Sequence, residues 1–148
     1  MYAKPSERAL ELLETKYNCA QAVFAACATD EGLTEAQRLA LSAAFGGGAA
    51  KQGEICGALS GALMALGEMR SKILAADPAA GRDAVTAQAQ EMIAAFRVAH
   101  GSILCRDLTG CLLYTEEGQR SFNEQDLRHK VCARLVAFAT DLAVAARK

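Results

Sequence analysis

The side chains in this sequence with the most distinctive chemistry are those of its six cysteines. Cys56 follows a glycine-rich stretch and precedes a run of small and apolar residues, so we expect it in the first turn of a buried helix. Unpaired amides and the positive end of the helix dipole would favour a thiolate there. The alternative is that Cys56 is a small apolar residue of a tight core, since free cysteines are often buried.

Cys19 repeats this arrangement at a second predicted helix start. Asn18 belongs to a residue type that caps helices well, and Cys19 would be the first helical residue after it. If the two thiols lie close together, they could form a site for an anionic cluster or an exchangeable dithiol. Cys56 and Cys19 are therefore the predicted catalytic thiols.

Cys105 and Cys132 lie in surroundings that allow a role in a site but do not require one. Cys105 follows a predicted helix break and precedes Arg106, which could lower the pKa of the thiol or form an ion pair in the turn. Cys132 lies among apolar residues within a predicted helix, where packing in the core is a strong alternative. His129 is on the same helical face, and we interpret it as a solvent-facing side chain rather than a ligand.

The remaining cysteines, Cys27 and Cys111, are not expected in a site. Cys27 lies at an apolar position of a predicted helix, and Cys111 could be a spare thiol near Cys105. No two cysteines are spaced as Cys-x-x-Cys, so the local signatures of thioredoxin-like exchange, zinc ribbons and covalent haem attachment are missing. The glycines at 46–48 follow a predicted helix rather than a strand, which does not match a phosphate-binding loop.

The composition is typical of a globular, helical protein. The 148 residues, of which 52% are apolar and 22% charged, suit a single domain over residues 1–148. The net charge of −1 leaves no basic excess for binding nucleic acid. Abundant alanine, with few β-branched or aromatic residues, favours helix throughout.

The sequence predicts neither a membrane segment nor an export signal. The longest uncharged run, residues 55–67, is shorter than the ~20 residues of a membrane-spanning helix. The N-terminus lacks the apolar segment of a signal peptide, so we expect a cytoplasmic protein. In a reducing cytosol, six cysteines indicate metal ligation, redox chemistry or packing rather than structural disulfides.

Apolar residues recur at helical spacing and predict an all-α bundle of about six helices. The central helix carries Gly57, Gly61 and Ala65 four residues apart, a flat ridge that lets another helix approach closely. This helix should be buried, and the alanine-rich surface of the others indicates a homodimer. The predicted helices cover about residues 5–16, 19–30, 34–45, 56–70, 83–100 and 121–148, with a turn at 77–81, a short helix or turn at 105–111 and a polar loop at 116–119.

The order of these features resembles the family whose motif is written C_GCAxxG_C_C and whose members are described as redox-active. The likeness covers nearly the whole chain. One departure lies in residues 56–61, where this chain reads Cys-Gly-Ala-x-x-Gly, so the cysteine and the first glycine are exchanged relative to the motif. The segments that carry the likeness are 18–23, the glycines at 46–48, residues 56–67, residues 105–108 and Cys132.

The chain is also similar to the N-terminal part of split-Soret cytochromes, for which a four-cysteine iron–sulfur-like site has been proposed. Carried over by position, this resemblance implies a site formed by Cys19, Cys56, Cys105 and Cys132. The haem-binding part of those cytochromes has no counterpart in this sequence.

Three functions remain open at the level of sequence. The leading hypothesis is an iron–sulfur cluster on Cys19, Cys56, Cys105 and Cys132, serving electron transfer to an unknown redox partner or redox sensing. The second is a metal-free thiol–disulfide enzyme or sensor, in which Cys56 attacks and Cys19 or Cys105 resolves. The third is a helical interaction module with a structural zinc or merely buried cysteines.

Overall fold

A computed structural model describes residues 4–29 and 31–147, and this part of the chain is all-α, with helices and no β-strand, as predicted. It forms nine α-helices rather than about six, because three short helices (α5, α7 and α8) occupy segments expected as helix ends, turns or loops. The elements are α1 (Pro5–Glu14), α2 (Cys19–Ala26), α3 (Glu35–Leu41), the 3₁₀ turn η1 (Ala43–Phe45), α4 (Gly57–Met69), α5 (Ser71–Ala76), α6 (Pro78–His100), α7 (Cys105–Thr109), α8 (Glu116–Glu124), the π-helical segment η2 (Arg128–Cys132) and α9 (Ala133–Ala145).

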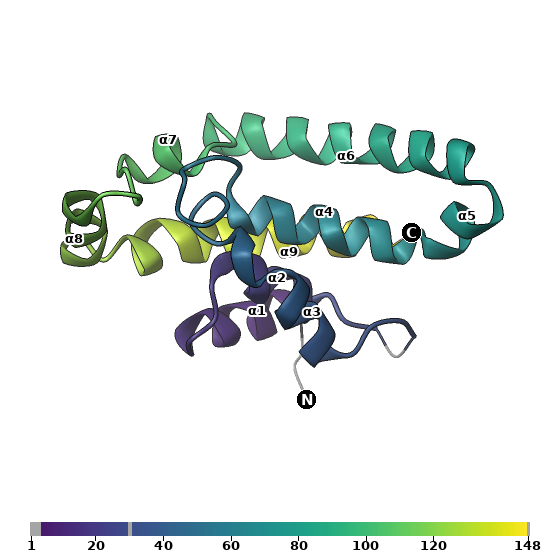
Figure 1. Ribbon diagram of the computed structural model, residues 1–148, viewed down its shortest axis with the longest axis horizontal. Helices are drawn as coiled ribbons and strands as arrows, with labels where there is room; N and C mark the ends of the chain where they lie inside the picture. Colours follow the sequence, from purple (N-terminus) through teal and green to yellow (C-terminus); the bar gives the residue numbers. More distant parts are fainter. Residues whose placement is uncertain (1–3, 30, 148) are drawn as a thin grey trace.

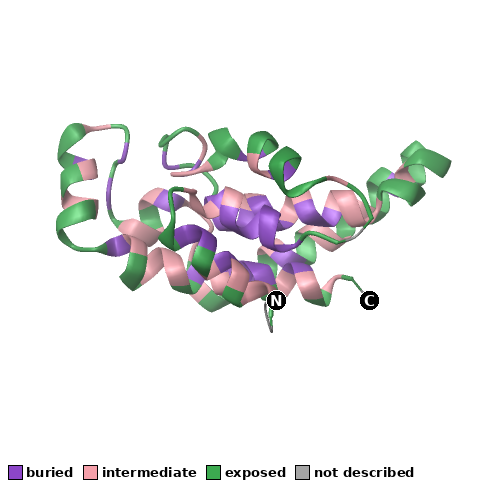
Figure 2. Cartoon of the chain, turned by 90° about the horizontal axis from the view of Figure 1, so that it is seen from below, coloured by how far each residue is buried: buried purple, intermediate pink, exposed green. Residues whose placement is uncertain are grey.

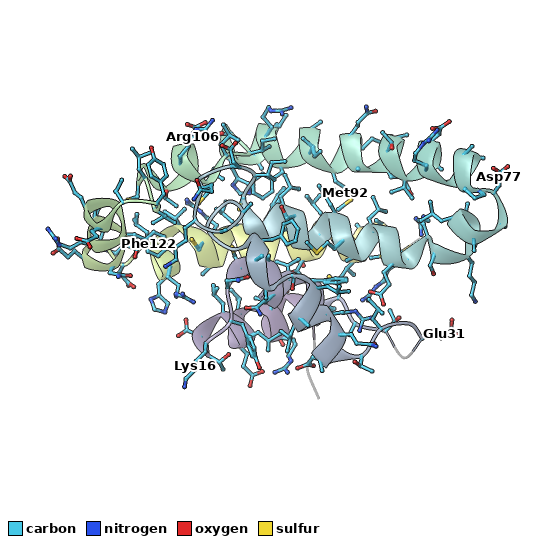
Figure 3. The ribbon with its side chains drawn as sticks, viewed as in Figure 1. Lys16, Glu31, Asp77, Met92, Arg106 and Phe122 are labelled. Carbon is cyan, nitrogen blue, oxygen red and sulfur yellow. The ribbon has the colours of Figure 1, made fainter. Side chains whose placement is uncertain are left out.

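Helix α4 is the centre of the fold, as predicted from its small and apolar residues. It packs against α2 and α9, while α1 covers α2 and α9 from the other side. The long helix α6 runs along the opposite side of α4, and α7 and α8 lie at one end of the molecule (Figure 1). Met92 projects from α6 toward α4, where it is buried (Figure 3). Buried residues concentrate on the central helices, whereas α8 is largely exposed (Figure 2).

The predicted small-residue ridge on α4 lets α2 approach unusually closely. A Cβ atom added at Gly61 would lie 2.6 Å from the carbonyl oxygen of Ala20, which is closer than real side chains come. Ala65, one turn further on, is buried as well. Gly67 is different, because a Cβ there would meet nothing within 4 Å. Gly67 is therefore not part of the close contact that the ridge makes.

The start of α2 follows the prediction closely. The Asn18 side chain accepts a hydrogen bond from the Gln21 amide, and the Gln21 side chain accepts one from the Asn18 amide. This reciprocal pair fixes Cys19 as the first residue of α2. The predicted end near 30–32 is wrong, since α2 ends at Ala26; Asp30 itself lies outside the described residues.

Two predicted irregular segments are instead helical. The predicted turn at 77–81 includes the first turn of α6, because the Asp77 side chain caps it by accepting from the Ala80 amide and Pro78 fits the first helical position. The predicted polar loop at 116–119 is the first turn of α8, which Thr115 caps through Gly118. Proline and glycine at 77–81 and polar residues at 116–119 are typical of irregular chain, but a capping side chain starts a helix in both places.

The described residues contain no helix that combines the length and apolar character needed to cross a membrane. The longest helix, α6, is 23 residues long but carries charged residues along its exposed sides.

Candidate functional site: a cavity lined by four cysteines

A cavity of about 480 Å³ lies at the N-terminal end of α4, and four of the six cysteines line it. They come from four separate elements: the start of α2, the residue before α4, the start of α7 and the end of η2. These cysteines are Cys19, Cys56, Cys105 and Cys132, the set predicted as a site. Their convergence in one cavity is a finding; their role as ligands or catalysts stays a prediction.

The other two cysteines do not line this cavity. Cys27 is buried in the main core, and its pKa is raised to about 12 by burial. Cys111 is buried in a small cluster with Cys105, Leu113 and Leu127. Both positions agree with the expectation that neither thiol belongs to the site, and they supply controls within the same chain.

Cys19 rests over the start of α4. A Cβ atom at Gly57 would lie only 2.5 Å from the Cys19 sulfur, so only glycine leaves room for it. Burial raises the pKa of the Cys19 thiol, although the backbone amides of Gly47, Ala20 and Ala58 donate toward the sulfur and lower it. The thiol is therefore buried among donors that would stabilise a negative charge on sulfur.

Cys56 is the residue directly before α4, at the N-cap. Its amide donates to the Ile103 carbonyl (2.8 Å), and its carbonyl accepts from the Ser60 amide. The start of α4 provides amides to the Cys56 sulfur as expected, but burial acts against the thiolate expected there. Burial raises the pKa of Cys56 far above its usual value, and the amides of Leu59 and Ala58 offset this only in part.

Cys105 is brought beside Cys56 by two short stretches of chain that pair with each other. The Cys105 amide donates to the Glu54 carbonyl (2.7 Å), next to an isolated antiparallel bridge between Ile55 and Leu104. Of the two roles expected for Arg106, the structure shows the ion pair, formed with Glu54 (3.1 Å), and not a lowering of the pKa of Cys105. Burial raises this pKa to about 11.

Cys132 ends the π-helical segment η2, whereas an ordinary helix was predicted there. Burial raises its pKa to about 12, and negative charge on Cys19 or Cys105 would raise it further, while Arg128 lowers it. π-Helical turns within helices often occur at functional sites. Here the turn carries two residues of the cavity wall, Arg128 at its start and Cys132 at its end.

The wall facing η2 is a turn of left-handed helix. Five consecutive residues, 47–51, have positive φ, and Ala49, Ala50 and Lys51 do so without the freedom of glycine. The glycines of this stretch predict a flexible loop. The structure shows it fixed by backbone hydrogen bonds, including one from the Ala50 amide to the Ala44 carbonyl (2.7 Å). Backbone strain of this kind persists where the surroundings enforce it, often at binding sites.

Two positively charged residues of the cavity wall were not among the predicted site residues. Lys51 and Arg128 line the cavity, and no aspartate or glutamate is among its described lining residues. Phe122, which projects from α8, adds an apolar part of the wall (Figure 3). The signal for Arg128 was its spacing of four residues from Cys132, which is typical of residues that share one side of a helix.

His129 is exposed and does not line the cavity, in agreement with the solvent-facing interpretation. Its Nδ1 lies 2.6 Å from Asp126 and its Nε2 lies 2.7 Å from Glu14. The hydrogen bond and charge of Asp126, followed by the charge of Glu14, raise the pKa of His129. The residue joins the start of η2 to the end of α1.

Within residues 4–29 and 31–147, no three histidine, cysteine, aspartate or glutamate side chains are arranged to hold a metal ion. The four cavity thiols therefore do not form a ready-made site for one ion. The cavity instead offers four sulfurs around a space that has the volume of a small-molecule site.

The comparison with protein families identifies the class to which this chain belongs. The sequence model described as "Putative redox-active protein (C_GCAxxG_C_C)" matches residues 17–146, a span that includes all four cavity cysteines. The chain belongs to this family. Comparisons with curated proteins and with solved structures found no match, so the similarity to split-Soret cytochromes is not confirmed.

Proposed function

We propose that this protein holds an iron–sulfur cluster on Cys19, Cys56, Cys105 and Cys132, and that the cluster serves electron transfer or redox sensing. One observation carries the proposal: four cysteines from four separate elements line one cavity, and the two remaining cysteines do not. Four cysteine thiolates are the usual ligand set of such clusters, which supply one-electron chemistry over a wide range of potentials.

The electrostatics of the thiols support coordination of metal ions by the four sulfurs. Burial raises the pKa of all four thiols, and negative charge on Cys19 raises the pKa of each of the other three further. Four thiolates therefore repel one another in an otherwise empty cavity. Iron would remove this penalty, because a metal deprotonates the thiols that coordinate it.

The shape of the site supports a cluster over a single zinc ion. In a cluster the four cysteines are divided among two or four irons, so the sulfurs lie further apart than four sulfurs around one zinc ion. The backbone amides near Cys19 and Cys56 would donate to the ligand sulfurs, and such hydrogen bonds tune the reduction potential.

A metal-free thiol–disulfide enzyme receives less support, because its attacking thiol needs a lowered pKa and burial raises that of Cys56. A redox partner, a homodimeric state and a cytoplasmic location stay predictions from the sequence.

The test is anaerobic purification followed by iron, acid-labile sulfide and zinc analysis with visible absorption spectra. We expect a coloured protein with iron and sulfide, and loss of both in Cys19→Ala, Cys56→Ala, Cys105→Ala and Cys132→Ala. The matched controls Cys27→Ala and Cys111→Ala should keep the cluster. A colourless protein that takes up no iron on reconstitution, or one that holds zinc in its place, would refute the proposal.

A further inference from the structure

We propose that Arg128 is the charge-compensating residue of the four-cysteine cavity and makes the cavity selective for anionic guests. The proposal deepens the function proposed above, on which it rests for the identity of the resident anion, a thiolate-ligated cluster. Its basis is the position of the guanidinium group, the path of η2 and the charges that line the cavity.

The Arg128 side chain is held in place by backbone carbonyls. Its Nη1 donates to the carbonyl oxygens of Leu13 (3.1 Å) and Tyr17 (3.3 Å), at the end of α1 and just before the cap of α2. The carbonyl end of a helix favours a cation. These two bonds tether the guanidinium beside the chain segment that leads into Cys19.

The π-helical segment η2 places Arg128 and Cys132 on the same cavity. They are the first and last residues of this segment, and both line the cavity wall. The positive charge of Arg128 also opposes the burial that raises the pKa of Cys132. Both side chains therefore border the space that one bound molecule would occupy, and both belong to the same helical turn.

Arg128 has no carboxylate partner among the described residues, and its printed hydrogen bonds go only to backbone carbonyls. Elsewhere Arg8, Arg38 and Arg106 each pair with a glutamate. In the cavity, Arg128 and Lys51 meet no carboxylate in the described wall. A half-buried cation without a counterion is costly, and an anion in the cavity would offset that cost.

The first test needs no cluster. The reduced, metal-free protein is alkylated in parallel with iodoacetate, an anion, and iodoacetamide, its neutral analogue, and the rate at each cysteine is measured by peptide mass spectrometry. Both reagents attack the same thiolate, so the ratio of their rates reports the local potential and not the pKa of the thiol. We expect Arg128→Gln to lower the iodoacetate-to-iodoacetamide ratio at Cys132 about threefold to tenfold.

Three controls separate charge from structure. Arg128→Lys keeps the charge and should keep the ratio, while Arg134→Gln removes a charge from the start of α9, outside this cavity, and should leave it unchanged. The iodoacetate-to-iodoacetamide ratio at Cys27 should not change in Arg128→Gln, because that thiol lies in the main core. High salt should lower the ratio in the native protein and hardly change it in Arg128→Gln.

The second test uses the cluster-loaded protein. Removing a positive charge makes an added electron less favourable, so Arg128→Gln should shift the reduction potential to a more negative value while Arg134→Gln does not. An unchanged alkylation ratio in Arg128→Gln, or an equal loss in Arg128→Lys, would overturn the inference. If no cluster assembles, the proposed function fails, but the alkylation test still decides the role of Arg128.

Discussion

The two ends of helix α4 differ in whether the charged groups around them are neutralised by other side chains. At the C-terminal end, Glu68 accepts hydrogen bonds from Arg38 Nε (2.8 Å) and Nη2 (2.5 Å) and from the Leu33 amide (2.8 Å). Arg38 also donates to the Leu33 carbonyl and is almost fully buried. Each charge at this end therefore has its partner within the chain.

At the N-terminal end, the charged groups have no oppositely charged side chain beside them in the described cavity wall. Four thiols meet there, two cations line the same cavity without a described carboxylate, and the Cys19 sulfur is surrounded by backbone amides. The comparison teaches that a charge buried for structure is neutralised inside the fold. A cavity built for a guest keeps donors and charges that the guest completes.

The largest effect on stability is expected from breaking the ion pair between Arg38 and Glu68 at the C-terminal end of α4. Glu68→Ala leaves Arg38 buried without its counterion, and we expect a loss of about 3–5 kcal/mol in the free energy of unfolding. Urea titration measures it. The matched control is Glu31→Ala, which removes a glutamate from an ion pair with Lys72 in which both side chains are exposed, and should change little. Similar losses in the two variants would show that Arg38 is not held by its charge partner.

The second-largest effect is expected at the N-terminal end of α4, where an added side chain would enter the space occupied by Cys19. Gly57→Ala puts a methyl group into the Cys19 sulfur and the Phe45 carbonyl, so we expect a loss of about 1–3 kcal/mol and impaired iron binding. Gly67→Ala, in the same helix, meets open space and should stabilise the protein by about 0.5–1 kcal/mol. Thermal unfolding and iron analysis of both variants test this. Equal responses would refute the close contact of Cys19 with α4.

The smallest effect on the free energy of unfolding is expected from relieving strain in the left-handed turn that lines the four-cysteine cavity. Ala50 is exposed with φ of +48°, so Ala50→Gly removes the steric penalty of the left-handed conformation and should stabilise the protein by about 0.5 kcal/mol. Ala87→Gly, at an exposed position in α6, should instead destabilise it by about 1 kcal/mol. Chemical denaturation measures both. The same sign for the two substitutions would contradict the left-handed turn.

The features that local sequence patterns encode were predictable. The Asn18 cap, the glycine ridge and the all-α class follow from residue types and spacing, and the family resemblance supplied the set of four cysteines. Interactions between distant segments were not predictable in this way. Arg106 pairs with Glu54, 52 residues earlier, and nothing around Arg106 in the sequence signals that contact.

The backbone of the cavity walls was the hardest part to predict. Ala49, Ala50 and Lys51 are ordinary helix formers, so no propensity indicates that they adopt a left-handed turn. A π-helical segment likewise has no composition of its own. Both features depend on packing around the cavity, which only the three-dimensional structure reveals.

The segment Arg128–Cys132 amounts to an α-helix with one residue inserted, because a π-helix closes its hydrogen bonds one residue later. The wider turn accommodates this extra residue, and Arg128 and Cys132 lie at its two ends. Deleting one residue from this segment would restore an ordinary α-helical turn and change the spacing between Arg128 and Cys132. The gene therefore specifies this site by the length of the segment as well as by its residues.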